Sequence, residues 1–75
     1  MATLSDLTPR ELEILKLVLI GRTNKAIAGE IGVCEKTVEF HLHHIYTKIG
    51  VATRLLAGLW ATQQGIEILT REIPS

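Results

Sequence analysis

The sequence contains little cysteine, few aromatic residues and no excess of charge of either sign. Cys34 is the single cysteine, which excludes an internal disulfide and a zinc site built from several thiolates. Eight basic side chains balance eight acidic ones, so the formal net charge at pH 7 is zero. Domains that bind nucleic acid usually carry a basic excess, and the overall charge therefore argues against that class of protein.

Long apolar runs and targeting features are also missing. No run of about 18 uncharged apolar residues is available to span a bilayer. Asp6, Arg10 and Glu11 interrupt the N-terminal segment, so no secretory signal is visible and we expect a cytoplasmic protein that does not enter a membrane. With 75 residues, 47% of them hydrophobic, the chain suffices for one small core, and we predict a single domain over residues 1–75.

The spacing of the apolar residues is helical throughout. Gly21, Gly32, Gly50 and Gly65 punctuate the chain, and the stretches between them show no sustained alternation of the kind that strands require. The pattern predicts an all-α fold of four helices with a C-terminal tail over residues 66–75. The predicted helices cover approximately residues 9–20, 24–31, 35–49 and 54–64.

Local residues identify where these helices begin. Thr8 is followed three residues later by Glu11, which predicts a capping box at the start of the first helix. Thr23 and Thr53 are expected to cap the second and fourth helices. The corresponding position before the third helix is Cys34, and because sulfur is a poor hydrogen-bond acceptor we expect a weaker cap there.

The third helix has two contrasting faces. At 100° per residue its apolar side chains fall on one stripe, made of Val38, Leu42, Ile45 and Ile49. The opposite face carries a row made of Lys36, Phe40, His43 and Thr47, with Glu39 and His44 on its flanks. Two helices joined by a tight turn at Gly32, the second of them long, form the pattern of a helix-turn-helix.

The chemistry of the exposed row suits the DNA major groove. Phe40 is suited to thymine methyl groups, Lys36 to guanine or phosphate, and Thr47 to phosphate. Glu39 leaves two interpretations open. It either accepts a hydrogen bond from a cytosine amino group, which selects sequence, or remains a solvated carboxylate. Phe40 by itself also fits an isolated apolar surface residue, which is common in soluble proteins.

Four blocks of the sequence resemble the LuxR-type helix-turn-helix, also called NarL- or GerE-type. They are T-P-R-E-L-E-I-L, G-R-T-N-K-A-I-A, K-T-V-E-F-H-L and I-Y-T-K-I-G-V, which together with the linking residues reach from Leu7 to about Ala61. The resemblance implies a four-helix domain of bacterial transcription regulators, including response regulators. It implies that the third helix enters the major groove of double-stranded DNA and that the fourth pairs two protomers. It further implies a nucleoid location and allows RNA polymerase as a partner.

The resemblance also implies which residues bind. By position, the start of the second helix contacts the DNA backbone, the start of the third holds phosphates, and the middle of the third faces the bases. The predicted DNA-binding residues are Thr23, Asn24, Lys25, Lys36, Thr37, Glu39, Phe40, His43, His44 and Thr47. The predicted dimer interface is Leu55, Leu56, Leu59 and Trp60, where the two leucines at 55 and 56 replace the polar residues common in the family.

Other classes of function have weaker support. An enzyme would need Cys34 to meet a base, but His41, His43 and His44 lie on different sides of the third helix, so we predict no catalytic residues. Only His41 and His44 have a ligand-like spacing, without a third ligand, so we predict no metal and no cofactor. The serious alternative is a protein-interaction module of the same fold, suggested by the zero net charge and the apolar fourth helix.

Overall fold

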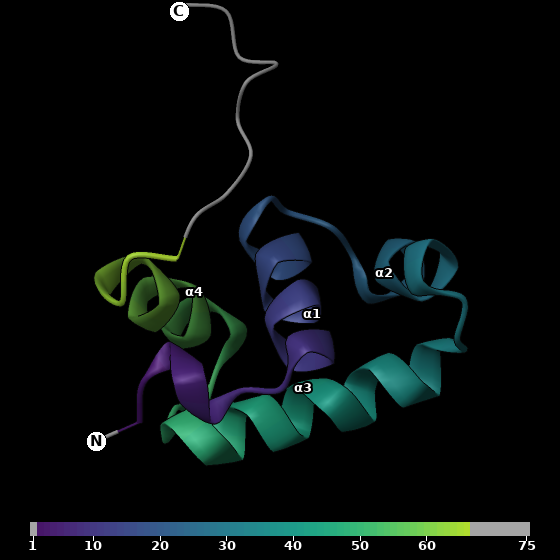
Figure 1. Ribbon diagram of the computed structural model, residues 1–75. Helices are drawn as coiled ribbons and strands as arrows, with labels where there is room; N and C mark the ends of the chain where they lie inside the picture. Colours follow the sequence, from purple (N-terminus) through teal and green to yellow (C-terminus); the bar gives the residue numbers. More distant parts are fainter. Residues whose placement is uncertain (1, 67–75) are drawn as a thin grey trace, which may run out of the picture.

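The computed structural model describes residues 2–66 and shows an all-helical fold in that range, as predicted (Figure 1). Its elements are the 3-10 turn η1 (Leu4–Asp6) and the helices α1 (Pro9–Leu19), α2 (Asn24–Ile31), α3 (Glu35–Ile49) and α4 (Arg54–Gln63). The helices α1 and α4 are each one residue shorter than predicted. Of the predicted tail, residues 67–75 lie outside the described residues. The turn η1 was not among the predicted elements, although Thr3 and Asp6 form a capping box there.

The expected caps begin three of the four helices. At α1, Thr8 Oγ1 accepts from the Glu11 amide at 3.1 Å while Glu11 Oε1 accepts from the Thr8 amide at 2.9 Å. Thr23 and Thr53 accept in the same way from the third residues of α2 and α4. Cys34 makes no side-chain cap hydrogen bond to α3, where a weaker cap was expected. The helix starts are therefore set by residues within three positions of each other.

Two helices end on a glycine in the left-handed region. Gly32 and Gly50 both have φ of 75°, a conformation that a residue with a Cβ adopts only at a cost. The Gly32 amide donates to Ala28 O at 2.9 Å, which closes α2 and turns the chain directly into α3. This short turn is the one that a helix-turn-helix requires.

The long helix α3 supports the other three. Figure 1 shows α1, α2 and α4 on the same side of α3, which leaves its opposite side uncovered. The predicted stripe of α3 lies in the core, with all four side chains buried: Val38, Leu42, Ile45 and Ile49. They meet the most buried side chains of α1 and α2, which are Ile14, Leu15 and Ile27. A residue on the far side of α3 is consequently free of the core.

The apolar residues of α1 lie on more than one face, but only part of that helix is buried. Ile14, Leu15 and Val18 are buried, whereas Leu12 and Leu17 are only partly covered and Ile20, at the C-cap, is 42% exposed. The reason is that α2, α3 and α4 together surround less than the full circumference of α1.

An ion pair connects α1 to the far end of α3. Lys48 Nζ lies 2.8 Å from Glu11 Oε1, and it also donates to the carbonyl of Asp6 at 3.4 Å. Glu11 is buried, with 6% of its surface exposed. It combines its capping function with a tertiary contact.

Within residues 2–66, no helix has the length and apolar character needed to cross a membrane.

Candidate nucleic-acid interface

The uncovered side of α3 carries the side chains predicted from the sequence. Lys36, Phe40, His43 and Thr47 are all exposed, and so are Glu39 and His44 beside them. Phe40 is the most notable of these, because 63% of its surface is exposed although the core of this small domain lies close by. Helix geometry explains this placement, since these residues lie opposite the buried stripe.

The ring of Phe40 is not isolated on that surface. It packs against the imidazole of His44, one helical turn further along, with ring centroids 4.6 Å apart and planes inclined by 60°. Such edge-to-face contacts between neighbouring turns restrict the ring. Phe40 is thereby presented outward as a partly ordered apolar group, which is the form suited to contact with a thymine methyl group.

Two hydroxyl groups of the predicted set have partners within the protein. Thr47 Oγ1 donates to the carbonyl of His43 at 2.9 Å, so it must break this bond before it donates to a phosphate. Thr37 Oγ1 lies 3.3 Å from Cys34 Sγ, and this contact lowers the pKa of the Cys34 thiol. Lys36, the first lysine of α3, is exposed in the first turn of the helix.

The start of α2 presents three potential donors in succession. Thr23 Oγ1 accepts from the Ala26 amide at 3.1 Å, which leaves its hydroxyl hydrogen available. Lys25 is exposed, and Asn24 is half-buried with its Oδ1 occupied by an arginine. Because the N-terminus of a helix also carries a partial positive charge, these groups are arranged to meet an anion such as a DNA phosphate.

A shallow hollow with polar and apolar side chains in its lining joins this helix start to α3. It is formed by the beginnings of α2 and α4 and the middle of α3, and its lining residues include Asn24, Glu39, His43 and Arg54. The structure therefore brings the predicted backbone-facing end of α2 next to two of the predicted base-facing residues of α3. Lys25 and Lys36 are not among the lining residues.

Arg54 lies beside the predicted site residues but was not among them. Its Nη1 donates to Asn24 Oδ1 at 2.8 Å, and its Nη2 donates to the carbonyl of Arg22. These partners are about 30 positions away along the chain, and no local pattern indicates such a contact. The only available signal was an arginine directly after the cap of the fourth helix, which resembles an ordinary surface residue.

The predicted dimer surface on α4 is only partly exposed. Leu55 and Leu59 are 81% and 54% exposed, and Leu56 is 43% exposed. Trp60 differs, because it is half-buried and packs against the core. Three leucines thus form the accessible apolar part of α4, and a shallow apolar hollow beside them extends to Val18 and Leu19 of α1.

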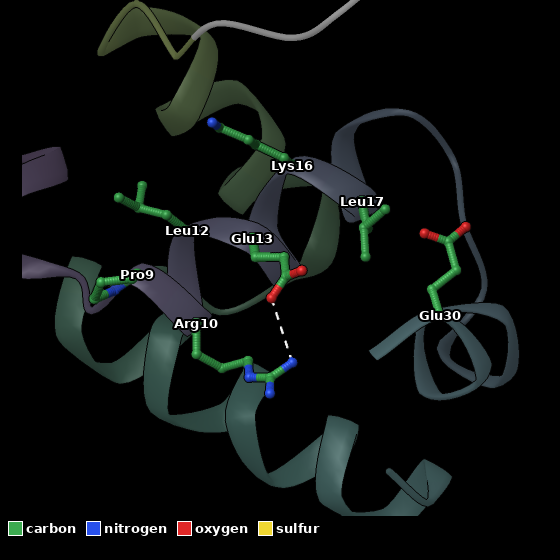
Figure 2. Close-up of a pocket in the computed structure, with 7 residues that line it drawn as sticks. All are labelled: Pro9, Arg10, Leu12, Glu13, Lys16, Leu17 and Glu30. Atoms are coloured by element: carbon green, nitrogen blue, oxygen red, sulfur yellow. Dashed lines mark hydrogen bonds and ion pairs between the residues drawn. The ribbon is translucent and has the colours of Figure 1, made fainter. Parts of the chain in front are cut away.

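A third hollow, between α1 and α2, has a different character. Figure 2 shows its lining side chains, in which two cations, Arg10 and Lys16, are matched by two carboxylates, Glu13 and Glu30. Arg10 pairs with Glu13 at 3.3 Å, and Glu30 pairs with Arg22 at 2.8 Å. This balance of charge offers no preference for a polyanion.

The single cysteine and the three histidines all lie within residues 2–66. The hydrogen-bonding partner of the Cys34 thiol is the Thr37 hydroxyl rather than a base. Among residues 2–66, no three histidine, cysteine or acidic side chains are grouped so that they hold a metal ion.

Comparison with known proteins identifies related sequences. A family model described as bacterial regulatory proteins, luxR family, matches residues 5–61. The nitrate/nitrite response regulator protein NarL of Escherichia coli strain K12 is 40% identical over 62 residues, which cover 83% of this chain and 29% of NarL. A protein of Mycobacterium bovis named as an HTH-type transcriptional regulator is 45% identical over 50 residues, 67% of this chain and 6% of that protein. The chain therefore spans less than a third of the length of these relatives.

Proposed function

The chain belongs to the luxR family of bacterial regulatory proteins, and we propose that it binds specific sequences in double-stranded DNA. The family consists of DNA-binding transcription regulators and not of enzymes. In this proposal α3 enters the major groove while the starts of α2 and α3 contact the phosphate backbone. The observation that carries the proposal is the uncovered face of α3, where exposed Lys36, Phe40 and His43 lie opposite a buried stripe.

The residues divide by the kind of contact each makes. Lys25 and Lys36 neutralise phosphates, and Thr23, Asn24 and Thr37 add hydrogen bonds to the backbone. Phe40, His43 and Glu39 face the bases, and Glu39 favours sequences that offer a cytosine amino group. His44 supports Phe40 through their ring contact. Thr47 takes part only where a phosphate displaces its bond to the His43 carbonyl.

The proposed assembly is a homodimer through α4 on a two-fold DNA site. Leu55, Leu56 and Leu59 supply the apolar contact, because they are exposed in the single chain although leucine is normally covered. The proposed setting is the bacterial cytoplasm, at the nucleoid, with RNA polymerase as a further partner. A response-regulator context rests on the name of one relative, NarL.

Salt dependence provides the test of DNA binding. Fluorescence anisotropy would follow the titration of random-sequence duplex DNA at about 50 and about 200 mM salt. If the two lysines of each protomer neutralise four phosphates per dimer, the affinity falls on the order of a hundredfold over that interval. Replacing Lys36 with methionine lowers the slope of log affinity against log salt by roughly 1.8 per dimer.

The same titration separates the proposal from its alternative, a protein-interaction module. The zero net charge and the apolar α4 favour that alternative. A folded domain that does not bind DNA at about 50 mM salt, or that binds without salt dependence, contradicts the proposal and favours the interaction module.

A further inference from the structure

Arg54 forms a bridge between the start of α4 and the start of α2. Its guanidinium donates to Asn24 Oδ1 at 2.8 Å and to the carbonyl of Arg22. Arg22 and Asn24 are the residues immediately before and after Thr23, the N-cap of α2. One half-buried side chain from α4 therefore holds both sides of the cap at the end of α2 that is proposed to meet phosphate.

The chemistry of the guanidinium determines the orientation of the Asn24 amide. A carboxamide has an acceptor end, Oδ1, and a donor end, Nδ2, whereas a guanidinium has only donors. The end of Asn24 that faces Arg54 must consequently be Oδ1. Its two Nδ2 hydrogens then remain available for an acceptor, and a DNA phosphate oxygen is such an acceptor.

We propose that Arg54 is a positioning residue for DNA binding: it orients the Asn24 amide and fixes the cap of α2, so that Asn24 donates to a DNA phosphate. This inference rests on the proposed function. In this proposal Arg54 acts through Asn24 and not through a phosphate of its own, since each of its terminal nitrogens already donates one hydrogen to a protein acceptor. The contact also links α4, the proposed dimer helix, directly to the DNA-facing end of α2.

A double-mutant cycle tests whether Arg54 acts through Asn24. Arg54→Met keeps the length of the side chain and removes its donors, and Asn24→Ala removes the oriented amide. Each single variant is expected to weaken binding of duplex DNA about three- to tenfold for each protomer bound, the equivalent of one hydrogen bond. In the Asn24→Ala background, Arg54→Met is expected to cost less than about twofold more, because its target is already absent.

Two controls exclude a simple effect of charge. Arg10→Met removes one exposed arginine from α1, whose partner is Glu13, and is expected to change DNA affinity less than about twofold. The salt slope of Arg54→Met should equal that of the parent, because Arg54 neutralises no phosphate. A slope lowered by roughly 1.8 per dimer would mean that Arg54 itself contacts a phosphate, and would overturn the proposal.

A measurement without DNA tests the contact itself. Asn24 is the only asparagine in the chain, so its side-chain amide can be assigned by nuclear magnetic resonance and separated from the two glutamines. The Asn24 amide resonances should shift in Arg54→Met and stay unchanged in Arg10→Met. If the Asn24 amide resonances are unchanged in Arg54→Met, the proposal is overturned whatever the DNA-binding result.

The outcomes are distinguishable from failure of the proposed function. Loss of salt-dependent DNA binding in the parent domain would contradict the proposed function and this inference with it. Intact parental binding with additive losses in the cycle would contradict only the positioning role of Arg54. If Arg54→Met does not fold, Arg54→Lys replaces it in the cycle. Lysine keeps the charge but reaches only one of the two acceptors, so a smaller loss is expected, again abolished by Asn24→Ala.

Discussion

Glu11 and Lys48 form an ion pair of 2.8 Å that joins the first turn of α1 to the last turn of α3. The same carboxylate accepts from the Thr8 amide, so a single buried group stabilises both a helix start and a contact between helices. Burial raises the pKa of Glu11. Hydrogen bonds from Lys48 and from the Thr8 amide lower it by more than burial raises it, so the pKa of Glu11 lies below its ordinary value.

The stability of the domain should therefore decrease in acid through Glu11. A carboxyl group with a lowered pKa in the folded state stabilises the fold above its unfolded-state pKa, and this contribution is lost as the pH falls through the folded-state pKa. At pH 7, Glu11→Gln should reduce the free energy of unfolding by about 1–2 kcal/mol. The difference from the parent should shrink between about pH 5 and pH 3.

Urea unfolding followed by the fluorescence of Trp60, the only tryptophan, measures these free energies. Lys48→Met is the matched variant, because it removes the other half of the pair and leaves the Thr8 capping box intact. Parallel pH profiles for the parent and Glu11→Gln would show that the pair does not carry the acid sensitivity.

The cap of α3 offers a position where the domain should become more stable. Cys34 makes no cap hydrogen bond to the helix, whereas serine at an N-cap accepts one from the backbone. Cys34→Ser should raise the free energy of unfolding by about 0.5–1 kcal/mol in the same urea experiment. Cys34→Ala is the control without an acceptor. Equal stability of the serine and alanine variants would contradict this explanation.

Phe40 should determine which DNA sequence is preferred more than how tightly DNA is bound. After selection of a specific site, Phe40→Ala should weaken binding to that site about tenfold, the cost of one poorly matched base pair. Binding to random-sequence DNA should change less than about twofold, because the lysines remain. The fold should persist, since Phe40 is 63% exposed. Equal losses on both kinds of DNA would exclude a base-facing role.

The leucines of α4 should control the oligomeric state. Glutamate at both Leu55 and Leu59 places two charges on the proposed dimer surface, and sedimentation velocity should then show a monomer. The affinity for a two-fold site should fall while that for an isolated half-site is kept. Because both leucines are exposed, the free energy of unfolding should change by only about 0.5 kcal/mol.

Ile20→Glu is the matched control for the dimer experiment, since Ile20 is an exposed apolar residue outside α4. It should leave the oligomeric state unchanged. A double leucine variant that remains dimeric would place the interface elsewhere.

Local structure was largely predictable from the sequence. The caps at Thr8, Thr23 and Thr53 and the turn at Gly32 all depend on residues within a few positions of each other. The stripe of α3 from Val38 to Ile49 was predicted for the same reason, because a helix places residues three and four apart on one face. The turn η1 was missed although Thr3 and Asp6 carry the same kind of local signal.

The composition of the candidate site was less fully predictable. Exposure of Lys36, Phe40 and His43 followed from the helical period, since they lie opposite the core stripe. The internal bond of the Thr47 hydroxyl was not anticipated, because a hydroxyl chooses between the helix carbonyl and solvent in the folded chain. The half-burial of Trp60, predicted as an interface residue, depends on how closely α4 approaches the core.

By itself the sequence determined the helices, their starts and the two faces of α3, because these depend on short-range periodicity and capping. Only the tertiary structure decided that Glu11 meets Lys48 and that Arg54 meets Asn24. These partners are 37 and 30 positions apart. A charged side chain can pair with any of several opposite groups, and the packing angles of the helices, set by the whole core, determine which partner comes within reach.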